Sequence, residues 1–132
     1  MRMKPALTLD DAHKMAAASR AAGAKIKREP TIAVVDGGGH LLFLERPDHN
    51  GVNTVELATL KARTAALRGR PSAAFAQRVQ EKAGFLMMPD LLGVEGGIPI
   101  HHEKECIGAI AVSGIDQDDE PVAKAGAEAY GR

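Results

Sequence analysis

The sequence has little of what several classes of protein depend on. Cysteine occurs once in 132 residues, at Cys106, so the chain can form no internal disulfide and no metal site made of cysteines alone. Three phenylalanines and one tyrosine are the only aromatic residues, too few for a platform on which nucleic-acid bases stack. No apolar run approaches the ~18 residues that a membrane-spanning helix requires. We therefore expect neither nucleic acid nor a membrane among its partners.

An excess of charge of one sign is also missing. Lysine plus arginine and aspartate plus glutamate both number 17, so no strong field attracts the chain to an anionic polymer or surface. The apolar content of 45% is ordinary for a globular domain, and the length predicts a single domain over residues 1–132. The N-terminal segment lacks the apolar core and cleavage signal of a secretory leader, which predicts a cytoplasmic protein.

The order of apolar patterns and turn signals predicts an α+β domain. In chain order we expect a helix over residues 9–27 capped by Thr8, strands over 31–36 and 40–45, a helix over 53–70, a helix that starts at Pro71–Ser72 with Ser72 as its cap, strands over 98–102 and 106–113, and a last helix with Pro121 in its first turn. The two strand pairs read as hairpins, so the sheet should be mainly antiparallel, with helices packed around it.

The segment from residue 53 to 70 carries two apolar stripes, where a surface helix needs one. At about 100° per residue, one stripe is rich in alanine and the other in leucine. Glu56 and Lys61 lie on the ridges between the stripes, too far round the helix to pair with each other. Each needs a partner from elsewhere, such as the loop 46–51, or is solvated, or makes a salt bridge between subunits. A carboxylate and an ammonium at the mouth of an apolar pocket could also transfer protons and stabilise charge.

For the other candidate residues, a structural role is at least as well supported by the sequence as a role in ligand binding. The triplet at 37–39 precedes a strand, so it favours a hairpin turn over a phosphate cradle, and Asp36 either holds this turn or faces a pocket. His101 and His102 are adjacent on a strand and point to opposite faces, which disfavours a shared metal ion. A single axial ligand to haem iron requires only one histidine, methionine or tyrosine. Ser113, before a glycine at a strand end, fits a turn or a ligand contact.

Several ordered runs resemble the GlcG/HbpS haem-binding family, whose domain also forms the C-terminus of PduO-type cobalamin adenosyltransferases. The matching runs are AVVDxGGHLL at 33–42, ERxD at 45–48, ELAxxKAxTA at 56–65, GRPS at 69–72, GGIPI at 96–100 and IGAIAVSG at 107–114. The resemblance covers nearly the whole chain. It implies a profilin-like fold with a five-stranded antiparallel sheet, and homo-oligomers. It also implies haem binding in some members and catabolism of small organic acids or aromatic compounds in others. The fold alone therefore does not determine the function.

The chain departs from the family pattern in three places. Glu95 stands before the diglycine where proline is common, the pair His101–His102 replaces a more typical Arg-Val, and His49–Asn50 occupies the loop before the helix 53–70. These changes place imidazoles and a carboxylate near segments that shape the family's pocket. They favour chemistry specific to this chain's ligand over simple haem binding.

Our first hypothesis is a homo-oligomeric protein that binds haem or a small ligand. The pocket would lie between the first hairpin, the helix 53–70 and the Gly96–Gly97 turn. The expected ligand-binding residues are Asp36, His40, His49, Gly96, Gly97, His101 and Ser113.

The alternative is a metal-independent catabolic enzyme, a hydrolase or tautomerase that acts on a small carboxylate or ring-cleavage product. Arg46 would bind the carboxylate. Glu56 would move a proton, and Lys61 would stabilise developing negative charge. This hypothesis requires the three side chains to meet in one pocket.

Overall fold

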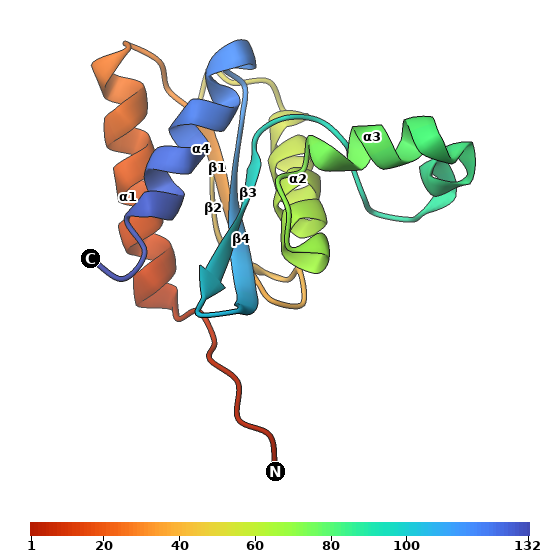
Figure 1. The fold of residues 1–132 in the computed structure, drawn as a ribbon. Helices are drawn as coiled ribbons and strands as arrows, with labels where there is room; N and C mark the ends of the chain where they lie inside the picture. Colours follow the sequence, from red (N-terminus) through yellow and green to blue (C-terminus); the bar gives the residue numbers. More distant parts are fainter.

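The computed structural model describes all residues 1–132 and confirms the predicted order of helices and hairpins. The elements are α1 (Leu9–Lys25), β1 (Thr31–Asp36), β2 (Leu41–Glu45), α2 (Thr54–Arg68), α3 (Ala74–Glu81), the short 3-10 turn η1 (Ala83–Met87), β3 (Gly97–His102), β4 (Glu105–Ser113), the 3-10 turn η2 (Asp116–Asp118) and α4 (Asp119–Glu128). Figure 1 shows them as one layer of strands between helices, with α3 and η1 projecting to one side. None of the helices is long and apolar enough to cross a membrane.

The sheet is antiparallel throughout, and its strand order is β2-β1-β4-β3. It has four strands, so the expectation of five is wrong. The two hairpins supply all four, and the segment between α3 and β3 forms turns and loop instead of another strand. The central strands β1 and β4 pair from Thr31 opposite Ser113 to Asp36 opposite Gly108. The profilin-like description of the fold stays a prediction.

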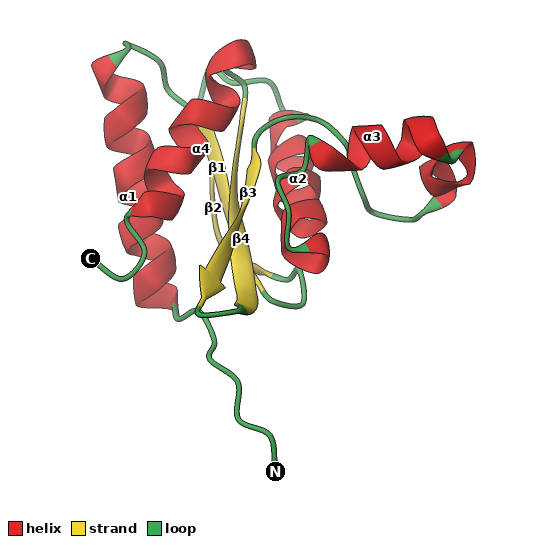
Figure 2. Cartoon of the chain, viewed as in Figure 1, coloured by secondary structure: helices red, strands yellow, loops and turns green.

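Two apolar cores lie on opposite faces of the sheet. Figure 2 shows the helices that cover these faces, with α1 and α4 on one side and α2 on the other. The larger one, which includes the fully buried Met15, Ile32 and Ile110, is covered by α1 and α4. The smaller one joins α2 to β1 and β4 almost entirely through alanine: its members are Ala33, Val35, Ala58, Ala62, Ala65, Ala66, Ala109 and Ala111. Because alanine side chains are short, the backbone of α2 approaches the sheet closely.

The close approach of α2 is visible at Gly97, at the start of β3. A Cβ atom there would lie 2.3 Å from the carbonyl oxygen of Lys61, a distance that no side chain tolerates. The alanine-rich stripe predicted from the sequence is therefore the face of α2 that packs on the sheet.

The leucine-rich stripe of α2 is only partly covered by the chain. Thr64 is buried, and its hydroxyl accepts a hydrogen bond from the amide of Leu92 in the loop before β3 (2.7 Å). Leu57 and Leu60 are half-buried, whereas Leu67 remains 46% exposed. The helix ends at Gly69, whose φ of 65° places it in the left-handed region that favours glycine.

Ser72 does not cap α3, contrary to the prediction. The helix begins at Ala74, and its first turn has no side-chain cap. The buried hydroxyl of Ser72 instead donates to the carbonyl of Val94 and accepts from the amide of Gly97 (2.9 Å). Ser72 therefore fixes the loop that enters β3, because two buried backbone groups there depend on its hydroxyl.

Candidate functional site

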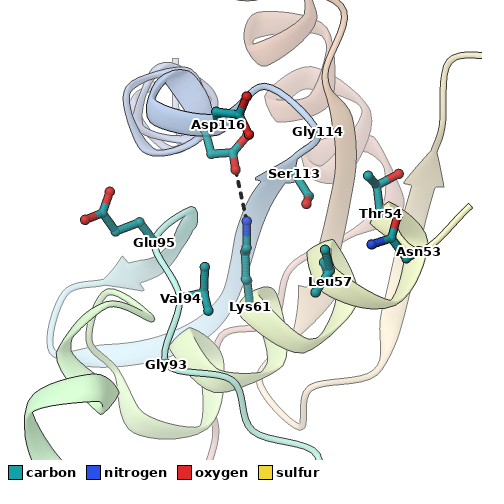
Figure 3. A pocket seen from close by; sticks show the side chains of 11 residues that line it. Asn53, Thr54, Leu57, Lys61, Gly93, Val94, Glu95, Ser113, Gly114 and Asp116 are labelled. Atoms are coloured by element: carbon teal, nitrogen blue, oxygen red, sulfur yellow. Dashed lines mark hydrogen bonds and ion pairs between the residues drawn. The ribbon is translucent and has the colours of Figure 1, made fainter. Parts of the chain in front are cut away.

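A cavity of about 590 Å³ opens at the end of the sheet where β4 finishes and α2 begins. Three segments surround it: the first half of α2, the loop before β3, and the chain from the end of β4 into α4 (Figure 3). Its lining residues are Asn53, Thr54, Leu57, Lys61, Gly93, Val94, Glu95, Ser113, Gly114, Asp116 and Asp119. Only Leu57 and Val94 are hydrophobic among them, so the other nine lining residues are polar, charged or glycine.

Lys61 occupies the floor of this cavity and is 2% exposed. Its ammonium donates to the carbonyl of Val112 (3.2 Å) and to Oδ2 of Asp119 (3.1 Å). An ammonium carries three N–H donors, so one donor is not used by these bonds. The dashed line in Figure 3 marks the ion pair with Asp119.

Gly96 makes room for the Lys61 side chain. A Cβ atom at Gly96 would lie 2.5 Å from the carbonyl oxygen of Val112 and 3.1 Å from both Cδ and Nζ of Lys61. Its φ of 130° is also one that other residues rarely adopt. The two predicted glycines, Gly96 and Gly97, thus act behind the cavity, where they let Lys61 and α2 pack closely.

Asp119, the first residue of α4, is 7% exposed. One carboxylate oxygen accepts the bond from Lys61, and the other accepts from the amide of Ile115 (2.9 Å). Burial raises the pKa of the Asp119 carboxyl above the ordinary aspartate value, although the Ile115 amide and the Lys61 ammonium act in the opposite direction. Nearby Asp116 adds to the upward shift of this pKa through like-charge repulsion.

Ser113 ends β4 and lines the cavity beside Lys61. The residue is 2% exposed, yet its hydroxyl makes no hydrogen bond to any other group of the chain. In Figure 3 the hydroxyl projects into the space between Lys61 and Thr54. Because the chain does not use this hydroxyl, it is available to donate to, or accept from, a ligand or water in the cavity.

Asp116 and Glu95 form the rim of the cavity: Asp116 comes from the segment after β4 and Glu95 from the loop before β3, and in Figure 3 the Glu95 side chain points away from Lys61. Both are exposed, and neither carboxylate takes part in a hydrogen bond or ion pair within the chain. Lys61 and Asp119 neutralise each other, so the rim carboxylates leave the cavity with a negative balance.

The predicted residues Glu56 and Arg46 do not join Lys61. Glu56 is exposed on another side of α2, beside a shallow hollow that also contains Asp90. Arg46 is exposed and donates to the carbonyl of Asn50 (2.8 Å) within its own loop. The expectation that the 46–51 loop supplies the partner of Lys61 is wrong, because that partner is Asp119.

Four further predicted ligand residues lie away from the cavity. Oδ1 of Asp36 accepts from the amides of Gly38 and His40 and so holds the hairpin turn, one of its two predicted roles. His40 is exposed beside this turn, and exposed His101 lies at the same end of the sheet, opposite Cys106.

The antiparallel register explains this separation. Gly108, which pairs with Asp36, and Ser113 are five residues apart on β4, or roughly 17 Å at the usual rise per residue. His49 is at the other end but exposed, with Nε2 3.5 Å from a carboxylate oxygen of Glu29. The pocket therefore does not include the first hairpin, contrary to the prediction.

Asp119 lines the cavity but is not among the residues that the sequence pattern predicts. Four acidic side chains stand close together at residues 116, 118, 119 and 120, and all of them suit the N-terminal end of a helix. The spacing does not indicate which one turns inward. The one indication in the sequence is that Lys61, if buried, needs an anionic partner. Identifying Asp119 as that partner requires knowing that α4 starts beside α2.

The cavity does not offer the donors that hold haem iron. No histidine, methionine, cysteine or tyrosine lines it, and only two of its eleven lining residues are hydrophobic. No group of three or more metal-binding side chains gathers elsewhere in the chain. The residues present therefore fit a small hydrogen-bonding molecule better than a haem group.

The chain resembles known proteins over most of its length. Residues 7–128 match the family model described as "Haem degrading protein HbpS-like". Protein GlcG of Escherichia coli (strain K12) is 36% identical over 114 residues, which is 86% of this chain and 85% of that protein.

Solved structures show the same fold. The crystal structure of HbpS superposes with a TM-score of 0.93 at 32% identity, covering 100% of this chain and 95% of that one. A PduOC:heme complex superposes with a TM-score of 0.86 and covers 96% of both chains, but at 20% identity it supports the fold alone. The length of the family match, together with the identity to GlcG, shows that this chain belongs to the HbpS-like family.

Proposed function

We propose that the protein binds a small polar molecule in the cavity above Lys61. The observation that carries this proposal is the unsatisfied hydrogen-bonding capacity at the cavity floor. Ser113 presents to the cavity a hydroxyl that no group of the chain uses, and Lys61 has one N–H that its two hydrogen bonds leave free. A small polar molecule that enters the cavity can form hydrogen bonds with both groups. The volume of about 590 Å³ falls within the range of small-molecule sites.

Thermal unfolding in the presence of a panel of small polar metabolites tests this function. A molecule that binds the folded state raises the midpoint of unfolding in a concentration-dependent manner. Val94 lines the cavity but is 47% exposed, so Val94→Trp should fill the opening while the core stays intact. Val52→Trp is the matched control, because Val52 is 79% exposed and lies outside the lining. Stabilisation that Val94→Trp does not reduce would contradict the assignment of the site.

Haem is a second candidate ligand, favoured by membership of a family described as haem-degrading. Because the Lys61 cavity contains no axial donor, haem bound by this chain would use a donor outside it, and His40, His101 and His102 are all exposed. Haem titration followed at the Soret band tests this. A Soret shift that disappears in the alanine variants of these histidines would support a separate haem site. A shift that survives them and disappears in Val94→Trp would contradict our reading of the cavity.

We also infer that the protein is a homo-oligomer. The support is the arm formed by α3 and η1, which projects from the body (Figure 1) and carries Leu86 and Met87 at 73% and 86% exposure. Exposed apolar side chains on a projecting segment are typical of subunit contacts. A second copy of this chain is the proposed partner. Sedimentation should show an assembly larger than 13.9 kDa that dissociates in Leu86→Asp/Met87→Asp. A wild-type monomer would contradict this.

A further inference from the structure

We infer that the ligand of the Lys61 cavity is a small molecule that carries a cationic amine close to a hydroxyl group. This inference rests on the proposed function and names the class of molecule for the same cavity. It depends on how charge and hydrogen-bonding groups are distributed between the floor of the cavity and its rim.

The charges around the cavity oppose an anionic ligand. Lys61 is the only cation in the lining, and its ammonium is already 3.1 Å from the carboxylate of Asp119. Asp116 and Glu95 add two carboxylates that no group of the chain neutralises. A carboxylate or phosphate at this site would face a negative rim, whereas an ammonium group would find partners for its charge there.

The hydrogen-bonding groups at the floor of the cavity indicate that the ligand carries a hydroxyl group. The Ser113 hydroxyl can both donate and accept, while the free N–H of Lys61 can only donate. A hydroxyl group on the ligand can accept from Lys61 and exchange a hydrogen bond with Ser113. Such a contact uses the free hydrogen-bonding capacity of Ser113 and Lys61 without introducing another charge beside the Lys61–Asp119 pair.

Together, the groups at the floor and at the rim predict the orientation of the bound ligand. Ser113 and Lys61 are buried, whereas Asp116 and Glu95 are exposed, so the two rim carboxylates lie nearer to solvent than the floor does. The hydroxyl end of the ligand would enter first, and the ammonium end would stay near the rim. An amino alcohol is the simplest molecule with this arrangement.

Three compounds of nearly equal size separate the possibilities: ethanolamine, ethylene glycol and glycolate. They share a hydroxymethyl group and differ in carrying a positive charge, no charge or a negative charge. Titration of each into the full-length protein, followed by amide chemical shifts, should give the tightest binding for ethanolamine, about fivefold tighter than ethylene glycol. Glycolate should bind weakest.

Two sets of variants test which residues cause the preference for ethanolamine. Asp116→Asn with Glu95→Gln should remove the fivefold advantage of ethanolamine and leave ethylene glycol unchanged. Asparagine also tolerates the positive φ of 53° at Asp116, so the loop should keep its conformation. Glu56→Gln is the matched control, since it removes an exposed carboxylate outside the cavity. Ser113→Ala should weaken ethanolamine and ethylene glycol equally.

The outcomes separate this inference from the function on which it rests. Tighter binding of glycolate than of ethanolamine would overturn the cationic class while leaving the cavity as a ligand site. Failure of all three compounds, while another small molecule binds in a manner sensitive to Val94→Trp, would also overturn the amino-alcohol class alone. If no small molecule binds in a manner sensitive to Val94→Trp, both the amino-alcohol class and the proposed function are contradicted.

Discussion

The ammonium of Lys61 and the carboxylate of Asp119 lie 3.1 Å apart in the interior, although 58 residues separate them along the chain. This contact joins the middle of α2 to the first residue of α4 across the end of the sheet. Asp119 is held in turn by the amide of Ile115, so the pair is fixed on both sides. The position of Lys61 in the cavity thus depends on packing from both faces of the sheet.

Removal of one member of this pair should destabilise the fold strongly. Lys61→Met keeps most of the aliphatic volume but leaves Asp119 buried without its cation, a change that typically lowers the free energy of unfolding by about 3–5 kcal/mol. Urea unfolding at neutral pH measures this loss. Asp119→Asn added to Lys61→Met should recover part of the stability, because no unpaired buried charge then remains. Lys124→Met, at an exposed position on α4, is the control. Equal effects of Lys61→Met and Lys124→Met would contradict a buried pair.

The pKa of Asp119 gives the stability a defined pH dependence. Burial raises this pKa in the folded state above the unfolded value of about 3.9, so the folded state binds the proton more tightly. Asp119 therefore contributes stability that is fully present below about pH 3.9 and is lost as the pH rises through the raised folded pKa.

Comparison with Asp119→Asn isolates this contribution. The free energy of unfolding of the wild type, minus that of the variant, should fall as the pH rises across this window and then level off. Denaturant unfolding at a series of pH values gives the difference directly. An increase of the difference with pH would mean that the folded pKa is lowered instead of raised.

Gly96 should not accept a side chain. Gly96→Ala places a methyl group 2.5 Å from the carbonyl of Val112 and against Lys61, at a φ of 130°. We expect a loss of about 2 kcal/mol or more in the free energy of unfolding, since backbone strain of this kind alone amounts to 1–3 kcal/mol. Gly84→Ala is the matched control, because a Cβ atom there meets nothing within 4 Å. Thermal unfolding of the two variants should differ clearly. A Gly96→Ala protein as stable as Gly84→Ala would show that the loop before β3 packs differently.

Alanine substitution of Ser72 and of Ser113 should have different effects on the free energy of unfolding. Ser72→Ala removes a hydroxyl that satisfies the carbonyl of Val94 and the amide of Gly97, and unpaired buried groups reduce stability by about 1–3 kcal/mol. Ser113→Ala removes a hydroxyl that has no partner in the chain, so stability should change little. Denaturant unfolding of both variants makes the comparison. Equal losses would indicate that the Ser113 hydroxyl is used by the fold itself.

Much of the fold could be predicted because it depends on local patterns. Two hairpins and the order of the helices follow from apolar runs, glycines and prolines, and the alanine-rich stripe of α2 indicated the face that packs on the sheet. The strand count came from the family resemblance and was one too high. The role of Ser72 was missed because a cap is a local pattern, whereas its actual partners lie more than 20 residues away.

The site was harder to predict because it is made by tertiary contacts. Lys61, Ser113 and Gly96 were identified as candidates, and the structure brings them together. The helix periodicity already indicates that Glu56 and Lys61 do not pair, but whether they line one pocket depends on the elements packed around α2, and in the structure they line different hollows. Asp119 could not be distinguished from its acidic neighbours without knowing which of them the start of α4 turns towards Lys61.

The location of the ligand is the central claim, and mapping of amide chemical shifts tests it most directly. A small polar ligand titrated into the isotopically labelled protein should perturb the amides around the cavity, at Ser113, Gly114 and Glu95, and Val94→Trp should abolish the perturbation. Perturbations confined to the opposite end of the sheet, around His40 and His101, would contradict the account.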